Sequence, residues 1–121
     1  MDATTETSEK ITAYVKQIES EGKIVHYPPR DVDQSQSGFD ICTQHRSAMR
    51  NCKEVHIWWD KKSTGSHFDF GMAFMLLTFN PRLRIVLANP EDVPETISKS
   101  FGNMIRKLSN PYTVTSCNLL N

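Results

Sequence analysis

The sequence predicts an α/β protein with an open, mostly parallel, doubly wound sheet of about four to five strands flanked by helices. Helix and strand patterns alternate along the chain without an internal repeat. The segment EVHIWW, residues 54–59, is apolar on both side-chain parities, which suits a parallel strand covered on both faces. The length of 121 residues suits one domain, residues 1–121, with a single core.

The first half of the chain predicts two helices separated by a strand. Apolar residues recur on one helical face of residues 8–21, and Gly22 closes that segment as a C-terminal cap. Residues 23–27 predict a strand, which Pro28–Pro29 ends. The polar stretch RDVDQSQSG then predicts a loop, and residues 38–51 a helix.

The second half repeats this alternation after the strand at residues 54–59. A buried helix is expected from about Ser66 until Asn80–Pro81 stops it, followed by a buried strand over residues 83–88. Residues 95–108 predict a further helix, and residues 112–115 a short edge strand. This order predicts right-handed crossovers between parallel strands.

Composition excludes several classes of partner. Lys and Arg together number 14, as do Asp and Glu, so no basic field is available to hold a nucleic acid polymer. No apolar run approaches the roughly 18 residues that span a bilayer, so a membrane is not expected. The four histidines lack metal-ligand spacing, and neither a metal nor a cofactor is predicted. An odd number of cysteines without a CxxC pair or an export leader predicts a reduced, cytoplasmic protein.

The junction between the central strand and the next helix is the expected ligand site. Ligands of open α/β sheets bind beyond the carboxyl ends of the strands, where residues 60–69 are expected. Ser63, Gly65 and Ser66 would present backbone N–H groups and hydroxyls to an anion, with Asp69 facing the same crevice. An equally good explanation is that Ser66 is only an N-cap and Asp69 a first-turn acid favoured by the helix dipole.

The same junction resembles a known enzyme family. The segment STGSHFDFGMA, residues 63–73, matches in spacing the turn Ser/Asp-x-Gly-x-x-x-Glu-Leu-Gly-x-Ala. That turn is typical of nucleoside 2-deoxyribosyltransferases and of related hydrolases that cleave the N-glycosidic bond of nucleoside 5′-monophosphates. Residues 21–25, 48–59 and 103–105 resemble further parts of these proteins, so the resemblance covers most of the chain. It implies a flavodoxin-like fold.

The resemblance also implies roles for individual residues. Asp69 stands where the family has its glutamate nucleophile, which forms a glycosyl-enzyme intermediate. Serine at position 63 resembles the branch that accepts a 5′-phosphate. His67 borders the nucleophile and would touch phosphate or leaving group, although an exposed loop histidine is the commoner situation. The substrate-binding residues expected on this basis are Asp60, Ser63, Gly65, Ser66, His67 and Asn103.

Two departures from the family pattern leave a second functional hypothesis open. Aspartate is one methylene shorter than glutamate, and the family's first strand has no counterpart, because the chain opens with MDATTETSEK. The first hypothesis is a nucleoside deoxyribosyltransferase-like transferase or a nucleotide N-glycoside hydrolase. The alternative is a catalytically reduced nucleotide-binding or assembly module. Without the first strand, residues 23–27 are expected to pair directly, in parallel, with residues 54–59.

A homodimer is expected as well. Members of the family are homodimers or larger, so the resemblance implies self-association. The apolar residues of the central helix also exceed what one buried helix face requires. These residues are Met72, Phe74, Met75 and Phe79.

Overall fold

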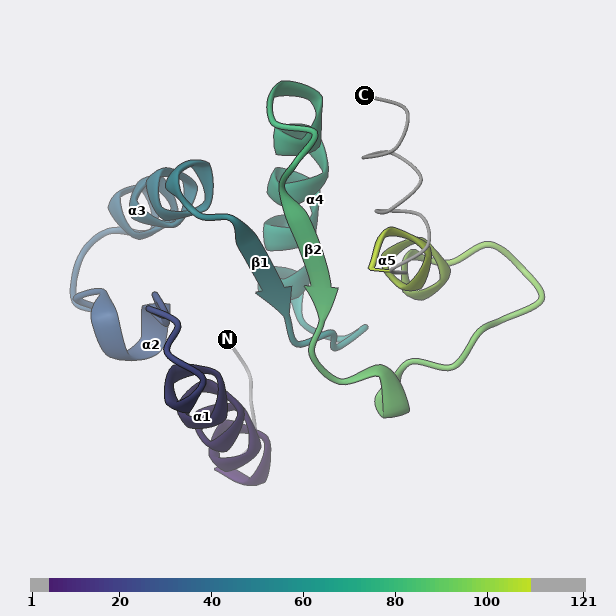
Figure 1. Ribbon diagram of the computed structural model, residues 1–121, viewed down its shortest axis with the longest axis horizontal. Coiled ribbons are helices and arrows are strands. Elements are labelled where there is room, and N and C mark those ends of the chain that lie inside the picture. The colour runs from purple at the N-terminus through teal and green to yellow at the C-terminus, as the bar shows by residue number, and fades with distance from the viewer. Residues whose placement is uncertain (1–4, 110–121) are drawn as a thin grey trace. The chain divides into compact units, whose positions relative to one another are not determined.

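The computed structural model describes residues 5–109, and the chain divides into two compact units at Asn51–Cys52. Figure 1 traces the elements in chain order. The expectation of a single domain over residues 1–121 stays a prediction.

The first unit consists of three helices, α1 (Thr5–Ser20), α2 (Pro28–Asp31) and α3 (Gly38–Asn51). The structure confirms the predicted helix at residues 38–51, and α1 begins three residues earlier than expected. Gly22 closes α1 with a φ of 90°, a left-handed conformation that glycine adopts without a Cβ penalty. Its N–H donates to the carbonyl of Glu19, which satisfies one of the last helical acceptors.

The strand predicted at residues 23–27 is wrong, because the backbone there is bound by side chains instead of by a neighbouring strand. The Arg30 Nη2 donates to the carbonyl of Val25 at 3.1 Å, and the backbone N–H of Tyr27 donates to Asp31 Oδ2 at 2.7 Å. The guanidinium also contacts Asp31 Oδ1 at 2.8 Å and Glu19 Oε1 at 3.0 Å. These contacts hold the pKa of Asp31 at about 2, chiefly through its hydrogen bond with Arg30. Ile24 is therefore left fully exposed instead of packing in a sheet.

The second unit is built on two parallel strands, β1 (Glu54–Ile57) and β2 (Arg84–Leu87), joined by α4 (Thr64–Phe79). Figure 1 shows the two arrows side by side and pointing the same way. The register places Val55 beside Ile85 and Ile57 beside Leu87, and all four side chains are buried. The strand and helix predictions at residues 54–59, 66–80 and 83–88 are thus confirmed as elements, with shorter strands.

The expected sheet of four to five strands is wrong. Within residues 5–109 the sheet has only β1 and β2, and the described chain is mostly helical. Because residues 23–27 form no strand, their predicted pairing with residues 54–59 is wrong as well. A flavodoxin-like, doubly wound sheet is therefore excluded for this part of the chain. The predicted strand at residues 112–115 lies outside the described residues.

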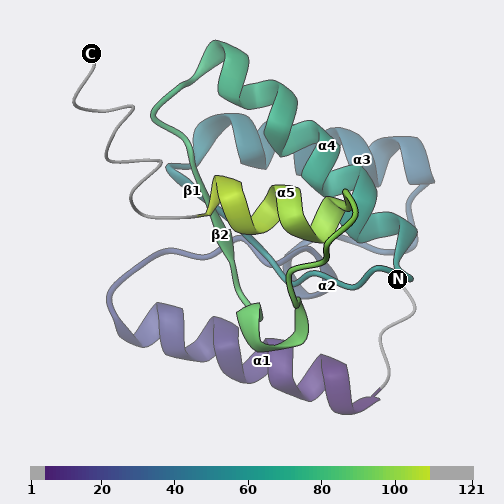
Figure 2. The same ribbon diagram turned by 90° about the vertical axis from the view of Figure 1, so that its right-hand side faces the viewer.

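The last helix of the second unit, α5 (Phe101–Leu108), follows a single 3₁₀ turn, η1 (Pro90–Asp92). It is shorter than the predicted helix at residues 95–108, because Ser100 caps it by accepting the backbone N–H of Asn103 at 3.1 Å. Figure 2 views this unit from the side of α5, which packs against β2, while α4 packs against β1. Phe70 and Ala73 of α4 and Ile105 of α5 are buried and complete the core of this unit.

Candidate functional site

The predicted site residues 60–69 follow directly after β1 and build the start of α4. The carbonyl of Asp60 accepts the backbone N–H of Ser63 at 3.0 Å, and Asp60 Oδ1 accepts that of Lys62 at 2.9 Å. These two bonds form a tight turn that leads β1 into the helix. The sequence therefore placed this segment correctly, at the carboxyl end of a parallel strand.

Both serines of this turn have structural partners. Ser63 is the N-cap of α4, with its Oγ accepting the N–H of Ser66 at 3.2 Å. The Ser66 hydroxyl donates to the carbonyl of Trp58 at 3.2 Å. The capping role that the sequence suggested for Ser66 thus belongs to Ser63. Thr64 and Gly65 contribute the first backbone N–H groups of the helix, which have no acceptor within the helix itself.

His67 lies inside the first turn of α4 and is half-buried, which corrects the picture of an exposed loop histidine. Its Nδ1 lies 2.7 Å from the carbonyl oxygen of Ser63. A carbonyl oxygen can only accept, so Nδ1 donates its proton in this bond. The imidazole ring lies 4.5 Å from that of Trp59 and 5.5 Å from that of Phe101. Aromatic packing on two sides fixes the orientation of the ring.

Asp69 lies in the second turn of α4 and is half-buried, next to the buried Phe70. Successive helical residues are about 100° apart, so Asp69 is about 200° around the helix from His67. The two side chains therefore leave α4 on opposite flanks. The structure does not bring this carboxylate and this imidazole together on one side.

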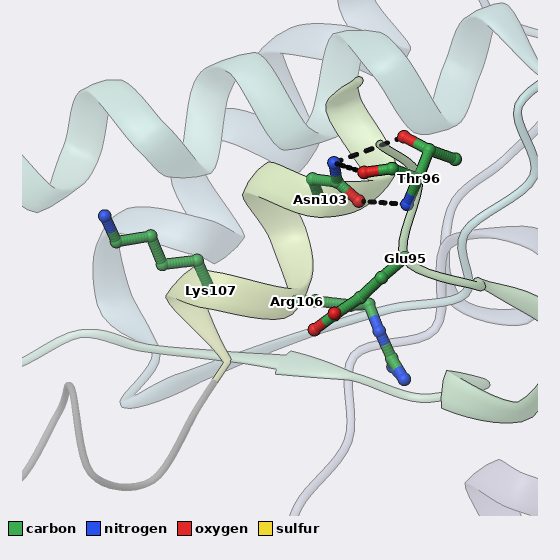
Figure 3. Close-up of a pocket in the computed structure, with 5 residues that line it drawn as sticks. All are labelled: Glu95, Thr96, Asn103, Arg106 and Lys107. Carbon is green, nitrogen blue, oxygen red and sulfur yellow. Dashed lines mark hydrogen bonds between the residues drawn. The ribbon is translucent and has the colours of Figure 1, made fainter. Parts of the chain in front are cut away.

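Asn103 lies on α5, the helix whose Phe101 packs against His67 at the start of α4. Its Oδ1 accepts the backbone N–H of Thr96 at 2.9 Å, and its Nδ2 donates to the carbonyls of Thr96 at 2.9 Å and Ser98 at 3.2 Å. Figure 3 shows the contacts with Thr96 at one side of a pocket of about 320 Å³. The residues that line this pocket are Glu95, Thr96, Asn103, Arg106 and Lys107.

The other predicted site residues do not line this pocket. They are Asp60, Ser63, Gly65, Ser66, His67 and Asp69. The Asn103 amide already bonds the loop before α5, which gives it a structural role in holding residues 96–98. Its predicted contact with a substrate stays a prediction.

The sequence did not single out Asn89, which binds the two strand ends together. This residue follows β2 and is 1% exposed. Its Oδ1 accepts the N–H of Trp59 at 2.7 Å, and its Nδ2 donates to the Trp59 carbonyl at 2.9 Å and to Asp92 Oδ2 at 3.3 Å. The amide thus continues the parallel ladder beyond β1. The sequence signal for this role is an asparagine between an apolar strand and Pro90. The same pattern is typical of an ordinary turn, so it does not identify the role.

The described residues contain neither a metal-binding cluster nor a membrane-spanning helix. Among residues 5–109, no group of three or more His, Cys, Asp or Glu side chains is placed to hold a metal ion. Across the same residues, none of the helices has the length and apolar character needed to cross a membrane.

Comparison with known proteins adds no family to this geometry. No protein-family model matches the chain, and neither a curated protein nor a solved structure matches it. The resemblance to nucleoside 2-deoxyribosyltransferases therefore rests on the sequence segments named above and stays a prediction. What the fold defines is a small parallel β–α–β unit with a polar turn at the carboxyl end of its first strand.

Proposed function

We propose that this chain binds a nucleotide or nucleoside at the turn between β1 and α4 and cleaves or transfers its N-glycosidic bond through Asp69. The observation that carries the proposal is the position of residues 63–69. They follow a parallel strand after a short turn, at the end where ligands of such units bind, and they match the spacing of the family turn. The N–H groups of Thr64 and Gly65 would face the 5′-phosphate, supported by the positive end of the α4 dipole.

The proposed reaction uses a carboxylate nucleophile. An Asp69 oxygen attacks the anomeric carbon as the bond from that carbon to the base breaks, and the base leaves with the bonding electrons and takes a proton from water. Water or a second base then attacks the same carbon, which breaks the ester and restores the carboxylate. His67 leaves α4 on the opposite flank, so its place in this proposal is beside the phosphate and not at the glycosidic bond.

A second candidate function is a nucleotide-binding or assembly module with reduced turnover. The two-stranded sheet of the described chain favours it, because positioning within a fraction of an ångström governs the rate of such a reaction. The short reach of an aspartate favours it for the same reason. Both candidates predict a nucleotide partner, and base release distinguishes them.

Two further parts of the proposal concern the protein in the cell. We propose a homodimer as the working form, in keeping with the family resemblance. The odd number of cysteines and the lack of a CxxC pair support a reducing, cytoplasmic location.

Incubation with the four deoxynucleoside 5′-monophosphates, followed by chromatography of free bases, tests the chemistry. The wild type should release base, and Asp69→Asn should lose about a hundredfold or more of that rate because the covalent catalyst is gone. Asp69→Glu, which restores the family residue, should keep or raise the rate. Glu91→Gln removes one negative charge from an exposed position of the same unit and should leave it unchanged.

Each outcome favours one candidate. Base release that survives Asp69→Asn would show that Asp69 is not the nucleophile. Nucleotide binding measured by calorimetry, with no base released from any of the four substrates, would favour the binding module. An absence of both binding and release would overturn the proposal as a whole.

A further inference from the structure

The helix α4 carries large apolar residues on its outer face as well as on the face that packs against β1. Phe70 and Ala73 form its buried face. Phe79 follows nine residues after Phe70, which places it about 180° around the helix. A contiguous group of exposed apolar residues on one face of a helix normally marks a contact surface. The outer face of α4 therefore needs a partner.

The exposed apolar residues of that face form a regular stripe. Phe68 is 54% exposed, Met75 is 60% exposed and Phe79 is 74% exposed, and Met72 between them is half-buried. Their intervals are four, three and four residues, the spacing of a coiled-coil seam. We call Phe68, Met72, Met75 and Phe79 the outer stripe.

We propose that the outer stripe is the contact between two copies of this chain, with the two α4 helices packed antiparallel. The inference rests on the proposed homodimer and names its surface. The stripe is symmetric about its centre in both spacing and residue type, because its order is Phe, Met, Met, Phe in either direction along the helix. A two-fold axis between Met72 and Met75 therefore places Phe68 against Phe79 of the partner subunit, and Met72 against the partner's Met75. A two-fold contact requires such a self-complementary surface.

The area of the stripe fits a weak dimer. The exposed parts of Phe68, Met75 and Phe79 amount to about 380 Å² per chain, if a fully exposed side chain of this size presents about 200 Å². Two copies, with Met72 and the adjoining backbone, bury about 1,000 Å², which is near the lower limit of a specific interface. The dimer should therefore exchange with monomer at micromolar concentrations.

Electrostatics do not oppose this arrangement. After Ser63, α4 carries only one carboxylate, Asp69, and one imidazole, His67, and neither belongs to the stripe. In an antiparallel pair the positive end of each helix dipole lies beside the negative end of the other, which is the favourable orientation.

A charge pair introduced across the two-fold axis tests both the surface and the direction of packing. Sedimentation velocity over a range of micromolar concentrations should show the wild type moving from the 13.8 kDa monomer to twice that mass. Met72→Glu and Met75→Lys should each weaken association by about tenfold or more, because each buries an unpaired charge. The double variant places each Glu against a Lys of the other copy and should recover association at low salt. Packed in parallel, the same variant would set like charges together and would not recover.

Thr78→Lys is the matched control, since Thr78 is exposed on α4 but lies outside the stripe. It should dimerise as the wild type does, and circular dichroism should give all variants the same helix content. A dimer that is unaffected by the single substitutions would overturn the outer stripe and leave the homodimer standing. Single variants that dissociate without recovery in the double variant would overturn the antiparallel pairing. A monomer at every concentration would overturn both, and base release by that monomer would leave the proposed chemistry intact.

Discussion

The Asn89 amide is the contact whose removal should cost this protein most. In Asn89→Ala the backbone N–H and carbonyl of Trp59 both lose their partner, and Trp59 is 6% exposed. Each buried polar group left without a hydrogen bond costs about 1–3 kcal/mol, so the loss of both partners should lower the free energy of unfolding by about 2–6 kcal/mol. This is a large part of the roughly 5–15 kcal/mol that stabilises a typical domain.

Urea denaturation followed by tryptophan fluorescence measures this loss. Both tryptophans, Trp58 and Trp59, lie in the second unit, so the signal reports on that unit. Asn103→Ala is the matched control: it removes the same amide, but from contacts with the exposed Thr96 and Ser98, where water can replace it. Its expected loss is about 1 kcal/mol or less. An Asn89→Ala loss equal to or smaller than that of the control would refute the reasoning.

Two predictions concern the first unit. Gly22→Ala should lower its stability by about 1 kcal/mol, because φ at this position is 90°. Gly38→Ala is the control, because this position has open space and no positive φ, and it should not lower the stability. Equal losses for the two variants in thermal melts followed by far-UV circular dichroism would contradict the argument. The lowered pKa of Asp31, about 2 in the folded chain, means that its pairing stabilises above about pH 4 and is lost as the pH falls towards 2. Asp31→Asn should therefore lower the melting temperature at pH 6 but not near pH 2, and an equal difference at both values would exclude this linkage.

The candidate site was predictable where its determinants are local. The turn at residues 60–63 and the start of α4 follow from small polar residues between two apolar segments, and the structure places them there. Ser63 and not Ser66 is the cap, and the Ser66 hydroxyl instead donates to the Trp58 carbonyl, a contact that the sequence did not predict. The packing of His67 against Phe101 joins residues more than thirty positions apart, so spacing along the chain could not reveal it.

By itself, the sequence determined α1, α3 and α4 and the two strands of the second unit, because periodicity and capping act within a few residues of each element. It did not predict α2, which lies where Pro28–Pro29 and a polar loop were expected. Local chemistry also sets the helix ends: Gly22 ends α1, Ser63 begins α4, and Asn80–Pro81 ends α4. Only the tertiary structure decided which apolar segments join a sheet. Residues 23–27 carry a strand-like pattern, yet Arg30 and Asp31 bind their backbone groups, and β1 takes β2 as its partner. Strand pairing satisfies hydrogen bonds between distant segments, so it depends on which donors and acceptors folding brings together.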